Sequence, residues 1–141
     1  MTSTNYTDTF IAVAPDCPVD CGTEPRQSAT PSVALLTFRL INDEPYAHTS
    51  DDALFAVHAA RHGVPAERWP TERAEFFAKP RACLRASDLP KRYGWGVHHD
   101  ADARVALYGM ETPDYAAFVA GMRLTSGGAV VAVVNAMRSK R

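Results

Sequence analysis

Two short segments with strand-like composition, separated by four residues, constrain the fold most strongly. YGWGVHH (93–99) and RVALYG (104–109) are rich in aromatic and β-branched residues, and DADA lies between them. Apolar runs of this length on either side of a short polar loop are typical of a β-hairpin. The sequence therefore predicts a hairpin over 93–109.

Three further segments are strand candidates. TFIAVA (9–14) predicts a short strand that ends at Pro15. SVALLTFRLI (32–41) also predicts a strand, because apolar and β-branched residues dominate it and no Gly or Pro interrupts it. AVVAVVNAM (129–137) fits a strand or a helix, so the conformation of 125–135 stays open.

Helix signals mark three segments. Thr49 can cap a helix whose first turn holds Asp51 and Asp52, and Gly63 ends it. A second helix is expected over 71–78, and a third over 113–122, where Thr112 is the cap and Pro113 takes the first position.

The 141-residue length fits one domain. Because hairpin and helices are separate along the chain, we expect an α+β fold, with a small mixed or antiparallel sheet and three or so helices packed on it. Residues 1–141 form the expected single domain, with frayed ends at 1–8 and 138–141. The Pro- and Gly-containing segment 15–32 is expected to be a long loop.

Composition narrows the classes of function. No apolar run approaches the ~20 residues that span a bilayer, and MTSTNYTDTF lacks the cationic and apolar regions of a secretory signal. We therefore expect a cytoplasmic protein with no membrane partner, in which the three cysteines are thiols. A pI near 6.5 argues against a general nucleic-acid binder.

The charges are unevenly distributed along the chain. Residues 1–52 hold eight acidic residues and two arginines, whereas 53–141 hold thirteen lysines and arginines and eight acidic residues. This asymmetry is compatible with an anionic partner for the second half, or with the two halves packing against each other.

CLRASDLPKRYGWGVHHD (83–100) has the highest density of chemically useful side chains. Its cations suit a phosphate or carboxylate, its aromatic rings offer stacking surfaces, and its glycines allow backbone to approach a ligand. The segment matches neither the GxxxxGK[ST] nor the GxGxxG phosphate loop. We expect a site for an anionic small molecule, such as one bearing a phosphate, formed by Arg85, Ser87, Lys91, Arg92, Tyr93, Trp95 and His98.

Strand alternation gives His98 a distinct position. In a strand, Trp95, Val97 and His99 face one way, while the glycines and His98 face the other. We expect His98 on the glycine face, with room for a ligand, where it could donate a hydrogen bond or exchange a proton near neutral pH.

Two alternative functions stay open, and the residues do not decide whether any reaction is catalysed. An enzyme could use the Cys83 or Cys17 thiol as a nucleophile, or His98 with Asp100 or Asp16 for acid–base chemistry. An interaction module could instead bind protein or nucleic acid through the acidic first half or the basic end of the chain.

The same residues also have structural interpretations: solvated cations, a core Trp95 and glycines at a bulge. His58 and His62 have the four-residue spacing of zinc ligands, but HExxH is absent, so we predict no metal site. No cofactor and no oligomeric state are predicted.

Several motifs occur together along the chain: Asp16-Cys17-Pro18, Pro45-Tyr46, Leu54-Phe55 with His58, Phe76-Phe77, Lys79-Pro80, CLRAS (83–87), LPKRYGWG (89–96), His98, Asp100 and AMRSKR (136–141). With these motifs the chain resembles an uncharacterised family of small bacterial proteins classed as a domain of unknown function. The resemblance covers nearly the whole chain and departs from the family at SGGAVVAVVN (126–135). It implies a single cytoplasmic bacterial domain of about this length, with no assigned activity, cofactor or catalytic residue.

Overall fold

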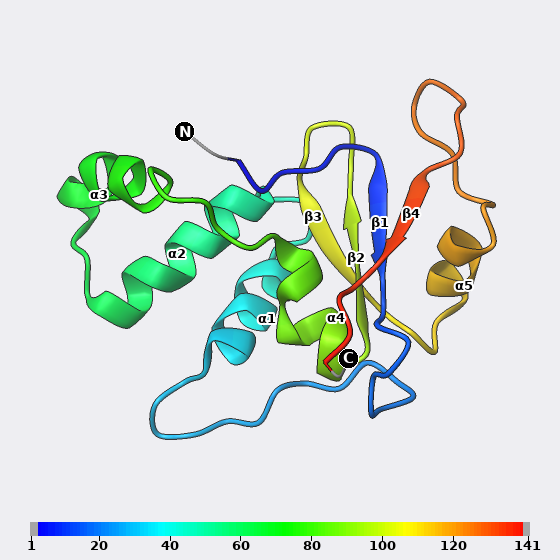
Figure 1. The fold of residues 1–141 in the computed structure, drawn as a ribbon, viewed down its shortest axis with the longest axis horizontal. Helices are drawn as coiled ribbons and strands as arrows, with labels where there is room; N and C mark the ends of the chain where they lie inside the picture. Colours follow the sequence, from blue (N-terminus) through cyan, green and yellow to red (C-terminus); the bar gives the residue numbers. More distant parts are fainter. Residues whose placement is uncertain (1–2, 140–141) are drawn as a thin grey trace.

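The computed structural model describes residues 3–139 and has an α+β fold (Figure 1). In this part of the chain a four-stranded sheet has the order β3-β2-β1-β4. β1 runs antiparallel to β2 and parallel to β4, so the sheet is mixed, which is one of the two arrangements that the sequence leaves open. The strands are β1 (Thr9–Ala12), β2 (Trp95–His99), β3 (Val105–Gly109) and β4 (Ala132–Asn135). The helices are α1 (Val33–Asp43), α2 (Ser50–His62), α3 (Trp69–Phe76), α4 (Asp88–Arg92) and α5 (Pro113–Val119).

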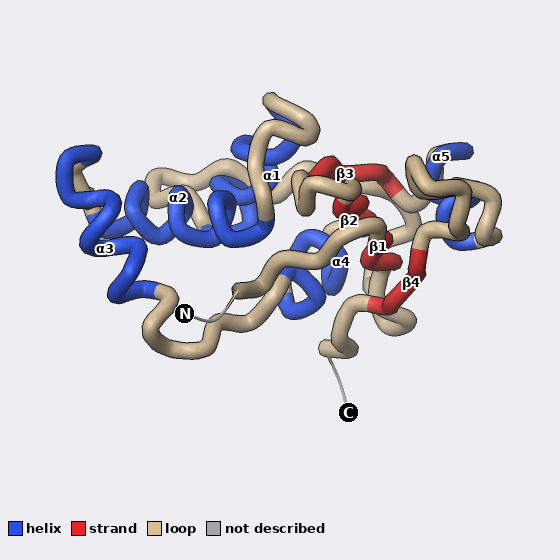
Figure 2. The backbone as a smooth tube through the Cα atoms, turned by 90° about the horizontal axis from the view of Figure 1, so that it is seen from above, coloured by secondary structure: helices blue, strands red, loops and turns tan. Residues whose placement is uncertain are grey.

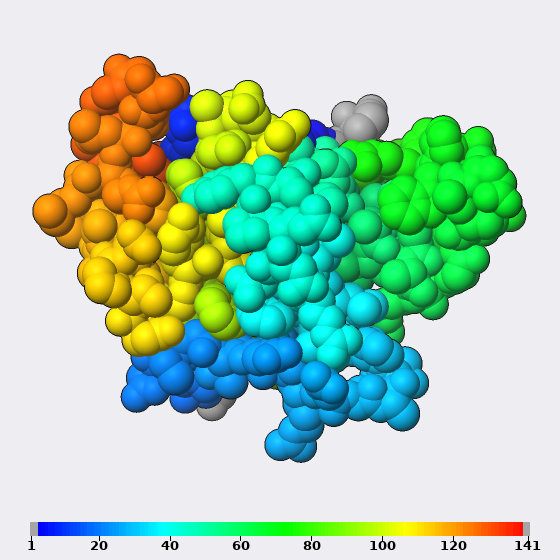
Figure 3. Space-filling view, turned by 180° about the vertical axis from the view of Figure 1, so that it is seen from behind, coloured from blue at the N-terminus to red at the C-terminus, as the bar shows by residue number. Residues whose placement is uncertain are grey.

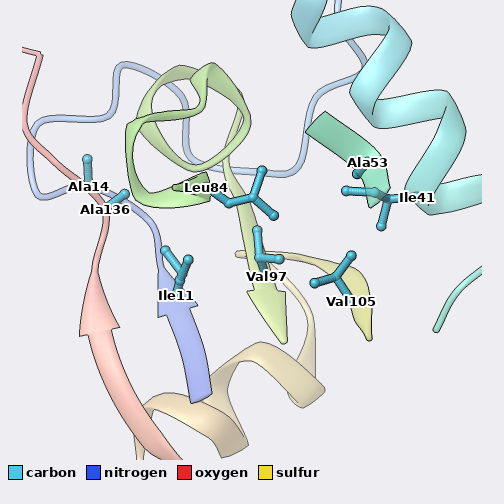
Figure 4. Close-up of a cluster of buried hydrophobic side chains, with 8 residues drawn as sticks. All are labelled: Ile11, Ala14, Ile41, Ala53, Leu84, Val97, Val105 and Ala136. Atoms are coloured by element: carbon cyan, nitrogen blue, oxygen red, sulfur yellow. The ribbon is translucent and has the colours of Figure 1, made fainter. Parts of the chain in front are cut away.

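Each face of the sheet has its own apolar cluster. Side chains from α1, α2 and the 3₁₀ turn Leu84–Ala86 meet one face, where Ile11 of β1 lies beside Val97 of β2 (Figure 4). α5 covers the other face, where Phe10 stacks on Phe118 with ring centroids 4.4 Å apart. Figure 2 shows the sheet between α1 and α5. Successive residues of β1 therefore contribute to different layers, as strand alternation requires.

The predicted hairpin is confirmed. β2 and β3 pair antiparallel, from Trp95 opposite Gly109 to His99 opposite Val105. The connecting loop is held by Asp100, whose Oδ1 accepts hydrogen bonds from the backbone N–H groups of Asp102 and Arg104, both at 2.9 Å. A local side-chain-to-backbone turn thus fixes the loop.

The predicted strand at 32–41 is wrong, because this segment forms α1. Ser32 Oγ accepts a hydrogen bond from Leu35 N at 3.1 Å and caps the helix. Leu35, Phe38 and Ile41 are buried at helical spacing, whereas Val33 is exposed. The near-continuous apolar run obscures this period, since Leu36 and Leu40 are also partly covered.

The other helix predictions hold in part. α2 begins with a capping box between Thr49 and Asp52 and ends at Gly63 in the left-handed region, as expected. α3 begins two residues before the predicted start, and α5 ends at residue 119 instead of 122. The sequence did not predict α4, a five-residue helix capped by Ser87. The ambiguous segment 129–137 contains strand β4.

The segment before β1 is bound to the start of α2. The buried Asp51 accepts hydrogen bonds from Thr4 N at 2.8 Å, Thr4 Oγ1 at 2.7 Å and Ser3 Oγ at 2.8 Å. Ser3 and Thr4 belong to residues 1–8, which the sequence predicts to fray, but their hydrogen bonds to Asp51 hold this part of the segment in place. Residues 1–2 and 140–141 of the two predicted frayed ends lie outside the described residues.

The long connection before α1, residues 13–32, contains no helix or strand. None of the helices within residues 3–139 has the length and apolar character needed to cross a membrane.

We predict that Gly96→Ala destabilises the fold. A Cβ at residue 96 would overlap the Phe10 ring and lie 2.8 Å from Tyr115 Cε2, so the layer between β2 and α5 must shift. Overpacking of this kind costs about 1–3 kcal/mol, measurable as a lower urea midpoint. Gly127→Ala is the matched control, because its nearest atom would be Thr125 Oγ1 at 3.8 Å. Equal midpoints for the two variants would contradict this packing.

Candidate functional site

The predicted anion-site residues do not converge on one point. Trp95 points toward α1, where its ring centroid lies 5.2 Å from that of Phe38. Its Nε1 donates a hydrogen bond to Thr23 O at 2.8 Å, which ties the long connection to the sheet. Trp95 thus has a packing partner and a satisfied N–H, as expected of an indole with a structural role.

Arg85 and Ser87 make structural contacts in the segment that leads into α4. Arg85 Nε donates to Asn135 O at 2.8 Å, and Arg85 O accepts from Met137 N at 2.9 Å, so this arginine binds the end of β4. Ser87 Oγ accepts from Leu89 N at 3.2 Å and caps α4.

Lys91, Arg92 and Tyr93 lie where α4 ends. Arg92 Nε is 3.8 Å from Asp88 Oδ1, and both side chains are at least half exposed. Lys91 forms no salt bridge with any other residue of the part that the structure describes. Tyr93 O accepts a hydrogen bond from Thr23 N at 2.8 Å. These cations are separated from His98, which faces the α5 layer.

The expectation of open space beside the glycines is wrong at Gly96. The rings of Phe10 and Tyr115 fill the volume that a Cβ would occupy there. Gly96 is therefore needed for packing between β2 and α5, and the room near His98 lies elsewhere.

His98 ends a chain of three hydrogen-bonded side chains. Tyr46 Oη lies 2.9 Å from His98 Nδ1 and 2.7 Å from Tyr108 Oη. We call Tyr108, Tyr46 and His98 the tyrosine–histidine chain. The residues come from β3, the turn after α1 and β2. Of the two ring nitrogens of His98, Nε2 has no hydrogen bond to any residue within 3–139.

The backbone conformation of Tyr46 is unusual. Its φ of 60° lies in the left-handed region, which costs a bulky residue about 1–2 kcal/mol. Tyr46 N donates to Val105 O at 2.9 Å, so the turn is fastened to the outer edge of β3. From there the side chain reaches the face of the sheet that carries His98. Strained residues of this kind occur often at functional sites.

Burial keeps the chain uncharged near neutral pH. Burial, reinforced by the hydrogen bond with Tyr108, raises the pKa of Tyr46 well above its ordinary value. Burial, together with the positive charge of Arg123, lowers the pKa of His98. A neutral imidazole and the neutral phenol of Tyr46 therefore share their hydrogen bond at pH 7.

His98 lines a cavity of about 210 Å³. In Figure 3 the N-terminal segment is visible between the loop after α5 and the β2–β3 turn, the three segments that border this cavity. Asp8 N donates to Asp100 O at 3.0 Å, and this bond brings the two acidic residues together. The lining residues are Asp8, His98, Asp100, Ala101, Asp102, Leu124, Thr125, Ser126 and Val131.

The alternative acid partner Asp16 lies at the opposite end of β1 from Asp8. Its Oδ1 accepts a hydrogen bond from Ser139 N at 3.3 Å. Asp100 is the one of the two expected carboxylates that lines the His98 cavity.

The cysteines are separate from this site and form no disulfide with one another. Cys83 Sγ lies 3.3 Å from Tyr6 Oη, and Cys83 lines a different cavity of about 260 Å³ beside α1. The hydrogen bond with Cys83 raises the pKa of Tyr6. Because Tyr6 packs on the α1 face of the sheet, the Cys83 thiol and His98 lie on different faces.

The histidine pair on α2 does not form a metal centre. The rings of His58 and His62 have centroids 4.5 Å apart, and His58 also packs against Phe76 at 4.6 Å. Among residues 3–139 no group of three His, Cys, Asp or Glu side chains is placed to hold a metal ion.

Fold and site define the class of protein: a small α+β domain with a half-buried tyrosine–histidine chain beside an acidic cavity. The chain belongs to a family of unknown function (DUF6157), whose model matches residues 1–141. No curated protein matches the chain. No solved structure matches it either.

Sequence reasoning missed Tyr46, Tyr108 and Asp8. Asp8 and Tyr46 lie far in sequence from His98, and no local motif connects them to it, whereas Tyr108 lies on the next strand of the same hairpin. The alternation of β3 was a usable signal, since Tyr108 is two residues from Ala106, which lies opposite His98. No sequence pattern indicated that the Tyr46 side chain extends past the edge of β3 to His98.

We predict that His99 makes the fold sensitive to acid. Burial lowers the pKa of His99 to about 4, and its ring nitrogens have no hydrogen-bond partner among the described residues. The unfolded chain takes up this proton near pH 6.5, before the folded protein does, so stability falls as the pH drops below 6.5. The loss reaches about 2 kcal/mol at pH 5.

Urea unfolding at pH 7.5 and pH 5 measures this loss. His99→Leu should reduce the difference between the two pH values, whereas the exposed control His62→Gln should retain it. An unchanged pH dependence in His99→Leu would assign the acid sensitivity to other groups.

Proposed function

We propose that this protein is an enzyme that uses His98 for general acid–base catalysis on a small molecule bound in the 210 Å³ cavity. One observation carries the proposal: the tyrosine–histidine chain occupies Nδ1 of His98 and leaves Nε2 without a protein partner in the described chain. A histidine oriented through one nitrogen, with the other available, has the arrangement that proton transfer requires.

The tyrosine–histidine chain can hold neutral His98 in either of its two tautomers. When Tyr108 donates to Tyr46 and Tyr46 donates to Nδ1, the proton of the neutral imidazole is on Nε2, which is then an acid. When Nδ1–H donates to Tyr46 and Tyr46 donates to Tyr108, Nε2 carries a lone pair and is a base. The two forms have the same charge. To pass from the first to the second, Nε2 gives its proton to the substrate, Nδ1 takes a proton from Tyr46, Tyr46 takes one from Tyr108, and Tyr108 takes one from water.

Electrostatics support the same role. Burial and Arg123 favour neutral His98, so the base form exists at pH 7. Because the raised pKa of Tyr46 prevents ionisation, its phenol remains both donor and acceptor. The left-handed backbone conformation of Tyr46 is unfavourable for a bulky residue. Such strain is common where a side chain must be positioned for function, and here it positions the Tyr46 hydroxyl against His98.

The test is turnover of metabolites by the whole protein. Purified protein is incubated with a bacterial metabolite extract, and consumed and formed species are followed by mass spectrometry. We expect His98→Gln to lower the rate at least 100-fold and Tyr46→Phe to lower it less while changing its pH profile. The control His58→Gln lies on α2 and should retain full turnover. No turnover by the native protein, or full turnover by His98→Gln, would overturn the proposal.

A second candidate function is binding of an anionic small molecule, such as one bearing a phosphate, at the end of α4. The observation in its favour is that Lys91 is unpaired within the described residues and Arg92 is only weakly paired with Asp88. Such cations remain available to a ligand. Arg85, bound to Asn135 O through Nε, borders the same segment.

We also propose a location in the bacterial cytoplasm, where three unpaired thiols persist.

Thermal unfolding with inorganic phosphate and with nucleotides tests this candidate. A ligand at about 100 times its Kd adds about 2.7 kcal/mol, which raises the Tm by several degrees. The increase should disappear when Lys91→Ala and Arg92→Ala are combined, and it should remain in His98→Gln. An equal increase in the double variant, or none in the native protein, would exclude this site.

A further inference from the structure

We infer that the His98 cavity takes a small substrate with a positively charged nitrogen group, an ammonium or a guanidinium. The inference rests on the proposed function and adds its substrate class. Three acidic residues line the cavity, Asp8, Asp100 and Asp102, and none of its described lining residues is Lys or Arg. With His98 neutral, the lining carries a net negative charge that favours cations and excludes phosphates and carboxylates.

These carboxylates are not neutralised within the protein. None of the salt bridges between described residues includes Asp8, Asp100 or Asp102. Asp100 uses Oδ1 to accept two backbone N–H groups of its own loop, and Oδ2 has no hydrogen bond within residues 3–139. At least one carboxylate oxygen beside His98 therefore remains available to a donor.

The cation that acts on His98 is paired with another acid, Asp114. Arg123 lies with its guanidinium carbon 4.3 Å from the centroid of Phe118, and its Nη1 is 3.4 Å from Asp114 Oδ1. Its charge reaches His98, where it contributes to the lowered pKa. Since Asp114 offsets this charge and Arg123 does not line the cavity, a substrate cation would be the first positive group among the three carboxylates.

Size and hydrogen bonding narrow the class further. A volume of about 210 Å³ is below the range typical of drug-sized ligands, so the substrate is a compact molecule. Ser126 and Thr125 also line the cavity, and a hydroxyl oxygen accepts an N–H donor, although less strongly than a carboxylate does. Thr125 Oγ1 already accepts a hydrogen bond from Ala129 N at 3.2 Å. A short amine or guanidine fits this lining if the atom that exchanges a proton with His98 lies close to its charged nitrogen group.

Three probes with four-carbon skeletons separate charge from shape: putrescine, butane-1,4-diol and succinate. Binding to the whole protein is followed by the NMR signals of the His98 imidazole at pH 7.5 and low salt. We expect putrescine to shift these signals with saturation, and the diol and succinate to leave them unchanged. The putrescine affinity should fall at least tenfold when Asp8→Asn and Asp100→Asn are combined. The amide oxygen in Asp100→Asn can still accept the two backbone N–H groups, so the loop is retained. Asp43→Asn, at the end of α1, is the control and should bind as the native protein does.

The outcomes distinguish this inference from the proposed function. Succinate or the diol binding as tightly as putrescine, or a double variant that retains native affinity, overturns the charge assignment. His98-dependent turnover confined to neutral or anionic metabolites overturns it too, and leaves His98 as the catalyst. Charge-dependent putrescine binding with turnover unaffected by His98→Gln refutes the catalytic proposal alone.

Discussion

The structure depends on the position of β1 between β2 and β4. All four of its residues are buried, and its parallel partner β4 follows more than a hundred residues later in the chain. Phe10 and Ile11 point into different layers, so this short strand anchors both apolar clusters. The same register sets Phe10 opposite His98, and Asp8, just before the strand, beside Asp100. The pairing that completes the core therefore also assembles the cavity.

Tyr46 connects the two layers in a second way. Its backbone is fastened to the outer edge of β3, next to α1, while its hydroxyl belongs to the α5 layer. The backbone of Tyr46 adopts the left-handed conformation, which disfavours bulky residues. This one residue thus joins the turn after α1, the edge of the sheet and His98 through hydrogen bonds.

Local signals predicted what local interactions determine. The hairpin and α2 could be read from the sequence, because turn residues, a capping box and a terminal glycine act within a few positions. The segment at 32–41 was misread, since apolar residues cover most of the surface of α1 and weaken the helical period. The sequence indicated His98, and the hairpin register could have indicated Tyr108. Tyr46 reaches His98 through a tertiary contact that no spacing in the sequence encodes.

The charge of the candidate site could not be predicted from the net charge of the sequence segment that contains His98. Residues 79–99 hold five lysines and arginines and one acidic residue, which favoured an anionic ligand. Folding separates them: Arg85 binds the end of β4, Lys91 and Arg92 lie on α4, and His98 faces the other layer. The carboxylates that meet His98 come from the start of β1 and from the hairpin turn. Because strand pairing selects which charges become neighbours, a locally basic segment contributes its histidine to an acidic cavity.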